Sequence, residues 1–206
     1  MVPGISSQEF PVLPEFEGAT ELALNVDALD SIIQRTTFAV SKDELRPALT
    51  GVFLQIRNGD LRAVATDGHR LVKIVDKNFK FDGDPREIIV PVKALDLIKR
   101  NLPDDGEVLC VIGETQLEMK LDGTIIFSRL IEGKYPHYES VIPTNNDSVL
   151  KLNAQALAQA VKRVQIFANP IGRQVVFSLK SDALEIRAED IELGGRGHES
   201  IAAQYD

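Results

Sequence analysis

Ala65-Thr66-Asp67-Gly68-His69-Arg70-Leu71 is the stretch from which the organisation of the chain can be worked out. Asp-Gly between two runs of alternating apolar residues predicts a β-hairpin, because a type I′ turn needs positive φ at both central residues. Apolar residues alternate at Leu61 and Ala63 before the turn and resume at Ile74 after it. A turn does not itself require an imidazole, a guanidinium and a leucine side by side, so we interpret the end of this hairpin as a surface that meets a partner.

The sequence around this hairpin repeats one pattern, a strand, a helix and three more strands, with a period of about 60 residues. The first copy is predicted at 22–26, 27–35, 49–57, 61–66 and 69–75. The second copy is predicted at 87–90, 92–102, 108–112, 116–121 and 124–130. The third copy is predicted at 149–152, 154–167, 174–180, 183–187 and 200–205. Each helix carries an apolar stripe at helical spacing, and the helix starts can be superposed.

These repeats predict an α+β fold class, in which βαβββ units form antiparallel sheets with the helices on one side. Two such units make a natural domain with paired sheets. We therefore expect a tail and linker over residues 1–20, a complete domain over residues 21–146 and half of a further domain over residues 147–206. Three units make one and a half domains, so we expect the chain to be part of a longer protein.

Composition limits the classes of function. The chain has 206 residues and a formal net charge of −8, which argues against a generally basic nucleic-acid binder and confines any such contact to a local patch. Cys110 is the single cysteine, so a disulfide framework and a cysteine-based zinc site are both excluded. No apolar run reaches membrane-spanning length, and the first residues do not resemble a signal peptide. We therefore expect a cytoplasmic protein with no membrane partner.

Cations gather on two of the predicted helices. On the second helix three cations point away from the apolar stripe with a single acid, Asp96, among them, and on the third helix two cations do so unopposed. These cations are Lys93, Lys99, Arg100, Lys162 and Arg163. They form either an ordinary solvated face or a place where an acidic protein meets phosphate. No side chain pattern here predicts base-edge recognition, so such a contact would be independent of sequence.

Catalytic chemistry is hard to find in this sequence. Asp67 and His69 could be part of an acid–base pair, but a hairpin turn beside a surface histidine explains them better. The acidic loop at residues 104–107 follows a helix and is interpreted as solubilising rather than metal-binding. The run Gly194 to Gly197 lies between two strands and is interpreted as a hairpin or bulge rather than a phosphate loop. We therefore predict no catalytic residue, no metal and no cofactor.

Several motifs resemble one family, the bacterial sliding clamp, which is the β subunit of DNA polymerase III. Val64 to Leu71, Val90-Pro91 before a helix and Tyr135-Pro136-x-Tyr138 resemble its middle domain, and the Thr-Asp-Gly-His-Arg-Leu run is highly specific to it. Clamps of this family have three similar domains in each subunit, and two subunits close into a ring whose hole is lined by helices. The resemblance implies that residues 1–20 are the tail of the first domain, 21–146 the middle domain and 147–206 the first half of the third.

The resemblance also implies a function and the residues that carry it. A clamp is a non-catalytic processivity factor that encircles double-stranded DNA of any sequence and tethers polymerase, clamp loader and repair proteins through short peptide motifs, as a homodimeric ring when full length. The family's peptide pocket matches Leu49, Thr66, Gly68, His69, Arg70, Leu71, Pro136 and Val141. The DNA-facing positions are Arg46 in the loop 42–48 and Lys93, together with the helix cations Lys99, Arg100, Lys162 and Arg163. Pro47-Ala48 replaces an aromatic pair found in some members, which weakens any base stacking at this loop.

Two interpretations of different class remain open at this point. The favoured one is the processivity clamp, and the alternative is a stand-alone β-rich peptide-binding module that never meets DNA. A nuclease or hydrolase is not supported, because the sequence lacks clustered carboxylates and a nucleophile–base pair.

Overall fold

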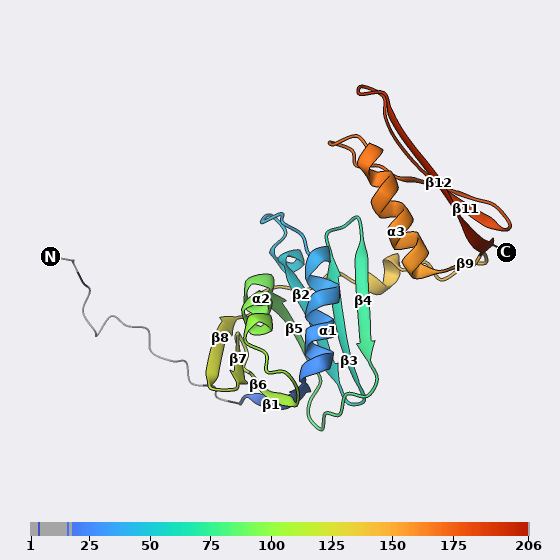
Figure 1. Cartoon of the computed structure of the whole chain (residues 1–206). Helices are drawn as coiled ribbons and strands as arrows, with labels where there is room; N and C mark the ends of the chain where they lie inside the picture. Colours follow the sequence, from blue (N-terminus) through green and yellow to red (C-terminus); the bar gives the residue numbers. More distant parts are fainter. Residues whose placement is uncertain (1–3, 5–15, 17, 206) are drawn as a thin grey trace. The chain divides into compact units, whose positions relative to one another are not determined.

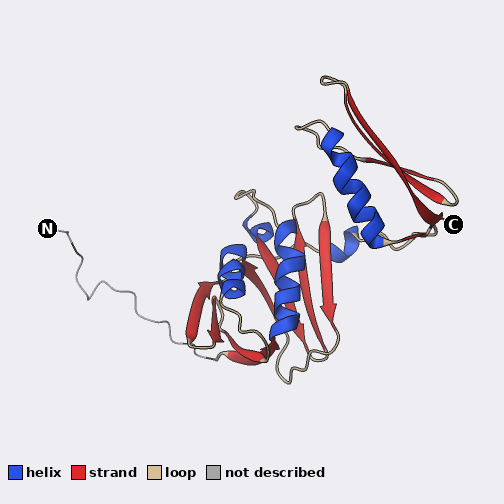
Figure 2. Ribbon diagram, in the orientation of Figure 1, coloured by secondary structure: helices blue, strands red, loops and turns tan. Residues whose placement is uncertain are grey.

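The computed structural model describes residues 4, 16 and 18–205, so most of the tail predicted over residues 1–20 lies outside the described residues. The chain divides into two compact units, Met1–Tyr138 and Glu139–Asp206. Both units combine antiparallel strands with helices, as Figures 1 and 2 show.

The first unit begins with one complete βαβββ repeat. A strand and a helix, β1 (Thr20–Asn25) and α1 (Val26–Thr36), are followed by the three-stranded meander β2 (Gly51–Arg57), β3 (Asp60–Thr66) and β4 (Leu71–Asp76). Two short 3₁₀ helices lie between α1 and β2. The predicted first repeat is therefore confirmed, with small shifts at the ends of its elements.

Helix α1 forms where the sequence supplies both a cap and an apolar face. The side-chain oxygen of Asn25 accepts a hydrogen bond from the backbone N–H of Ala28 at 3.1 Å, which satisfies one of the unpaired donors of the first turn. Leu29, Ile32 and Ile33 recur at helical spacing and are almost completely buried. This face holds the helix against the sheet.

The second repeat follows directly in the same unit. It consists of β5 (Arg86–Pro91), α2 (Val92–Arg100), β6 (Glu107–Ile112), β7 (Gln116–Leu121) and β8 (Thr124–Arg129). The predicted helix over 92–102 ends earlier, because the side-chain amide of Asn101 donates to the carbonyl of Leu97 at 2.8 Å and closes the last turn.

The two repeats of the first unit exchange their first strands. Strand β1 pairs with β6 and completes the sheet β1-β6-β7-β8, while β5 pairs with β2 and completes the sheet β4-β3-β2-β5. Helices α1 and α2 contact each other and lie on one side of the sheets (Figure 1). One continuous apolar core runs through both repeats, so neither repeat is a separate folding element.

The second unit contains a single repeat. Its elements are β9 (Leu150–Leu152), α3 (Ala154–Val164), β10 (Val176–Leu179), β11 (Ala183–Asp190) and β12 (Gly195–Tyr205). The sheet order is β10-β11-β12-β9, and α3 packs on β11 and β12. The chain continues from α3 as a short 3₁₀ helix, so the predicted helix over 154–167 is α-helical only to residue 164. Gly194, at a φ of 69°, lies in the turn of the β11–β12 hairpin, so the predicted hairpin is confirmed. Residues 195–197 were predicted to lie between two strands but belong to β12, where they pair with residues 188–190 of β11.

Candidate peptide-binding and DNA-facing sites

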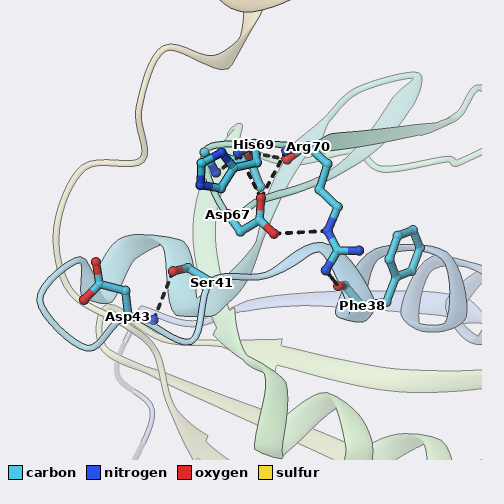
Figure 3. A network of polar contacts seen from close by, with 8 residues as sticks. Phe38, Ser41, Asp43, Asp67, His69 and Arg70 are labelled. Carbon is cyan, nitrogen blue, oxygen red and sulfur yellow. Dashed lines mark hydrogen bonds and ion pairs between the residues drawn. The ribbon is translucent and has the colours of Figure 1, made fainter. Parts of the chain in front are cut away.

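The hairpin tip, residues 67–70 between β3 and β4, is closed by a side chain, and the type I′ turn predicted for Asp67-Gly68 is wrong. Gly68 has a φ of 94°, but Asp67 is not at positive φ. The Oδ1 atom of Asp67 instead accepts hydrogen bonds from the backbone N–H of His69 at 3.0 Å and of Arg70 at 3.1 Å (Figure 3). A carboxylate that binds its own following backbone stabilises this four-residue loop in place of the two-residue turn.

Arg70 is fixed by its contacts on two sides of the tip. Its Nε donates to Asp67 Oδ2 at 3.0 Å, and its Nη2 donates to the carbonyl oxygen of Phe38 at 2.8 Å. The guanidinium carbon also lies 5.5 Å from the centre of the Phe38 ring, within cation–π range, and Figure 3 shows the side chain extended between the two partners. The tip is therefore already ordered before any ligand arrives.

The backbone N–H groups of His69 and Arg70 lower the pKa of Asp67 to about 2, and the Arg70 guanidinium adds to this effect. The carboxylate of Asp67 thus contacts the backbone of His69 and the side chain of Arg70, and it does not hydrogen-bond to the imidazole. The imidazole of His69 is exposed at the tip, where it is available to a partner.

The aliphatic positions of the predicted pocket differ in how much surface they offer. Leu71 opens β4, opposite Thr66 of β3, and is partly buried. Leu49 lies in the 3₁₀ helix Pro47–Thr50 that leads into β2, and only 6% of it is exposed. Leu71 therefore presents more of its side chain to a ligand than Leu49 does.

Pro136 is held in place by its aromatic neighbours. The ring of Tyr135 stacks on Phe53 of β2 with centroids 4.6 Å apart, and Tyr138 meets the same ring edge-on at 6.3 Å. The hydroxyl of Tyr138 donates to Gln55 Oε1 at 2.7 Å. Both tyrosines are buried and Pro136 between them is exposed, so the segment presents the proline to solvent.

Tyr135 also connects this segment to the base of the hairpin. Burial raises the pKa of Tyr135 to about 12, an effect that the nearby backbone N–H of Thr66 reduces. Among the described residues the hydroxyl has no hydrogen-bond partner of ordinary geometry. Val141, the last predicted pocket residue, belongs to the second unit and is 68% exposed. Its position relative to the hairpin stays a prediction.

Arg46, the predicted DNA-facing residue of the loop between α1 and β2, is paired. Its Nε donates to Asp43 Oδ2 at 2.9 Å, and this hydrogen bond is the main cause that lowers the pKa of Asp43. Half of the Arg46 side chain is exposed. Exposed ion pairs contribute little net stability, so Arg46 can exchange this partner for a phosphate at small cost.

The cations of α2 and α3 are not all unopposed, and two sequence-based expectations are corrected. Asp96 is not the sole acid near α2, because Lys99 Nζ lies 3.5 Å from Asp30 Oδ1 of α1. On α3, Arg163 is opposed: its Nε and Nη2 bind both carboxylate oxygens of Glu199 on β12. Lys93, Arg100 and Lys162 are exposed, and no ion pair to any of them is found within the described part of the chain.

Some residues that shape the site were missed by reasoning from sequence. Phe38 was not singled out, although an exposed phenylalanine just after a helix is a signal that could have been used; it is 55% exposed. Its contribution through a backbone carbonyl has no sequence signal at all. Tyr135 and Tyr138 were noted as a motif, but their stacking on Phe53 was not anticipated.

Within the described residues, no group of His, Cys, Asp and Glu side chains is arranged to hold a metal ion. The described helices are also too short or too polar to cross a membrane.

The exchange of first strands between βαβββ repeats and the ordered hairpin tip define a protein of the clamp class. The family model for the central domain of the DNA polymerase III β subunit matches residues 23–137, and the family model for its C-terminal domain matches residues 139–206. The chain therefore belongs to the family of DNA polymerase III β subunits, the β sliding clamps. The alternative of a stand-alone peptide-binding module finds no support in these comparisons.

Relatives and solved structures agree with this assignment. The chain is 34% identical to the β sliding clamp of Chlamydia pneumoniae, a match that covers 98% of this chain and 55% of that protein. It is 33% identical to the Bacillus subtilis clamp, with 98% and 54% covered. The crystal structure of the Pseudomonas aeruginosa β subunit matches with a TM-score of 0.90 at 31% identity, covering 98% of this chain and 56% of that one. A structure of the Pseudomonas aeruginosa clamp bound to griselimycin matches with a TM-score of 0.88 at 30% identity, covering 98% and 55%. The chain thus spans about half the length of the relatives it matches.

Proposed function

We propose that this chain supplies the middle domain, residues 21–146, and the first half of the third domain, residues 147–206, of a sliding clamp. The clamp is a non-catalytic processivity factor that closes as a homodimeric ring around double-stranded DNA in the cytoplasm. It tethers the polymerase, the clamp loader and repair proteins. The observation that carries the proposal is the hairpin tip, whose backbone and arginine are already ordered by Asp67 at the position that matches the family's peptide pocket.

The peptide site follows from the chemistry of the residues at the tip. Leu71 offers an aliphatic wall, and the exposed Pro136 is fixed beneath by stacked aromatic rings. His69 and Arg70 add polar groups at the edge that orient a ligand backbone. A short segment with a glutamine followed by leucine and phenylalanine suits such a site, because apolar anchors supply affinity and a few polar groups supply orientation. Thr66, Gly68, Leu49 and Val141 complete the proposed set.

The DNA contact is proposed to be weak and independent of sequence. Lys93, Arg100 and Lys162 are exposed. Arg46 and Lys99 form exposed ion pairs with carboxylates, and each can replace its carboxylate with a phosphate at small cost. Arg163 is the least available cation because Glu199 binds it through both oxygens. A few phosphate contacts without an encircling ring give dissociation constants of roughly 10⁻⁴ M or weaker at physiological salt, and binding falls as salt rises.

A matched pair of leucine and isoleucine variants tests the peptide site. Leu71→Ala should weaken binding of a fluorescein-labelled peptide containing Gln, Leu and Phe by tenfold or more, because burying one such side chain contributes about 1.5–3 kcal/mol. Ile125→Ala removes an aliphatic side chain that is 55% exposed on β8, away from the hairpin, and should leave binding unchanged. Fluorescence anisotropy measures both. Equal affinities for the wild type and Leu71→Ala would show that the hairpin is not part of the peptide site.

A further inference from the structure

The hairpin tip touches a second functional segment of the first unit, the connection between α1 and β2, residues 37–50. Arg70 Nη2 donates to the carbonyl oxygen of Phe38 at the start of this connection. Gly68 lies close to the connection's cation, since a Cβ added to it would be 3.2 Å from Arg46 Nη1. The proposed peptide site and the proposed DNA-facing loop are thus in direct contact.

The connection is internally bonded, so a restraint at one point acts on the rest. The backbone N–H of Asp43 donates to Ser41 Oγ, and that of Leu45 donates to Asp43 Oδ1. Asp43 also accepts from the Arg46 guanidinium, and the N–H of Ser41 donates to the carbonyl of Leu49 at 2.8 Å. The position of the Arg46 guanidinium therefore depends on the conformation of the whole connection.

The guanidinium of Arg70 retains donors for a ligand while it holds the connection. Nε is used by Asp67 and Nη2 by the carbonyl oxygen of Phe38, whereas Nη1 has no hydrogen-bond partner within the described residues and lies on the side of the guanidinium that faces the Phe38 ring (Figure 3). A guanidinium carries five N–H donors in a rigid fork. A peptide carbonyl or carboxylate can therefore accept from Nη1 without breaking the contact to Phe38.

We infer that Arg70 couples occupation of the peptide site to the order of the connection that carries Arg46. Asp67 and Phe38 act as positioning residues for Arg70. This inference rests on the proposed function, which supplies the peptide ligand. A ligand that accepts from Nη1 restrains the Arg70 guanidinium further and so lowers the entropy cost of ordering the connection, and peptide and phosphate therefore strengthen each other's binding. Linkage makes the effect reciprocal.

Hydrogen exchange of the free protein tests, without peptide or DNA, whether Arg70 orders the connection. Arg70→Lys keeps the charge but cannot bridge Asp67 and Phe38 with a planar fork. The backbone N–H groups of Ser41, Arg46 and Leu49 should exchange at least fivefold faster in this variant. Arg129→Lys makes the same change at an exposed position on β8, outside both proposed sites, and should leave these rates unchanged. Equal exchange in Arg70→Lys and the wild type would overturn the inference.

A second measurement distinguishes failure of the coupling from failure of the proposed function. A saturating acetylated peptide containing Gln, Leu and Phe should slow exchange in the connection at least threefold in the wild type and leave it unchanged in Arg70→Lys. Peptide that binds the hairpin but changes exchange in neither protein, or equally in both, overturns the coupling and leaves the proposed function intact. Peptide that does not bind at all overturns the proposed function and the coupling with it, even if the free protein shows the bond to Phe38.

Discussion

The two units are built from the same repeat, but they bury it to different depths. Counting from the helix caps Asn25 and Asn153, Ile33 of α1 corresponds to Val161 of α3. Ile33 is 1% exposed, whereas Val161 is only partly buried. The first strand after each helix differs in the same way, since β2 is buried along most of its length and β10 is largely exposed.

The sheet topology explains this difference. In the first unit β2 lies between β3 and β5, because the second repeat contributes its first strand. In the second unit β10 pairs only with β11 among the described strands, and β9 pairs instead with the end of β12. The local sequence thus specifies the elements of a repeat, while burial of its helix and its first sheet strand depends on a second repeat that exchanges a strand with it.

The largest expected effect compares the helix cores of the two units. Ile33→Ala should lower the free energy of unfolding of the first unit by about 2–5 kcal/mol, because it leaves a cavity in a closed core. Val161→Ala should cost the second unit roughly 1 kcal/mol, since its side chain is only partly removed from water. Hydrogen exchange at increasing urea reports each unit separately. Equal losses would show that the second unit is as well packed as the first.

Two glycines give the next comparison. A Cβ at Gly51 would lie 2.7 Å from the backbone oxygen of Val90 and 2.7 Å from the side chain of Ile131. The Val90 oxygen belongs to the backbone of a paired strand and cannot move aside, so Gly51→Ala should cost about 1–3 kcal/mol. A Cβ at Gly197 would lie 2.4 Å from the Phe167 ring, but that ring is 43% exposed and can turn outward.

We therefore expect Gly197→Ala to cost about 1 kcal/mol or less. The same exchange experiment measures both variants. A larger loss for Gly197→Ala than for Gly51→Ala would mean that the Phe167 ring is fixed as firmly as a paired strand.

Reasoning from sequence predicted the repeats because their signals are local. The apolar stripes and the helix starts that can be superposed located the helices. The structure adds that Asn25 and Asn153 cap two of these starts, since both accept from the backbone three residues on. The strands were located by alternation and by glycine-containing turns. The helix predicted over 154–167 is too long because a 3₁₀ helix over residues 165–167 continues the same pattern of residues after α3.

The site was only partly predictable, because several of its contacts join residues far apart in sequence. The pair Arg163–Glu199 spans 36 residues, and no local pattern identifies Glu199 as its acid. The contact of Arg70 with Phe38 uses a backbone carbonyl, which every residue has. The tip was misassigned because a two-residue turn and a loop closed by the side chain of Asp67 both begin with Asp-Gly.

The helix caps should not distinguish the two units. Asn25→Ala and Asn153→Ala each remove one hydrogen bond to the first turn, at 3.1 and 2.9 Å respectively. Each should cost about 1 kcal/mol in its own unit, because a cap acts within its helix whatever packs against it. Urea-dependent exchange again gives both values. A difference of more than about 1 kcal/mol between the two would show that tertiary packing contributes to one cap.

The smallest effect concerns two carboxylates that are held by different means. The pKa of Asp67, about 2, is lowered mainly by the backbone N–H groups of His69 and Arg70, whereas the pKa of Glu199 is lowered mainly by the Arg163 side chain. Because the folded-state pKa of Asp67 lies below its ordinary value of 3.8, its contribution to stability is present above about pH 4 and is lost as the pH falls toward 2. Arg70→Ala should raise the midpoint of the Asp67 carboxyl ¹³C titration but leave it below 3.8, since the backbone donors remain. Arg163→Ala should return Glu199 to about its ordinary value of 4.5. If Arg70→Ala restores the ordinary pKa of Asp67 in full, the ion pair rather than the backbone orders the tip, and a ligand that draws Arg70 away would also disorder the hairpin.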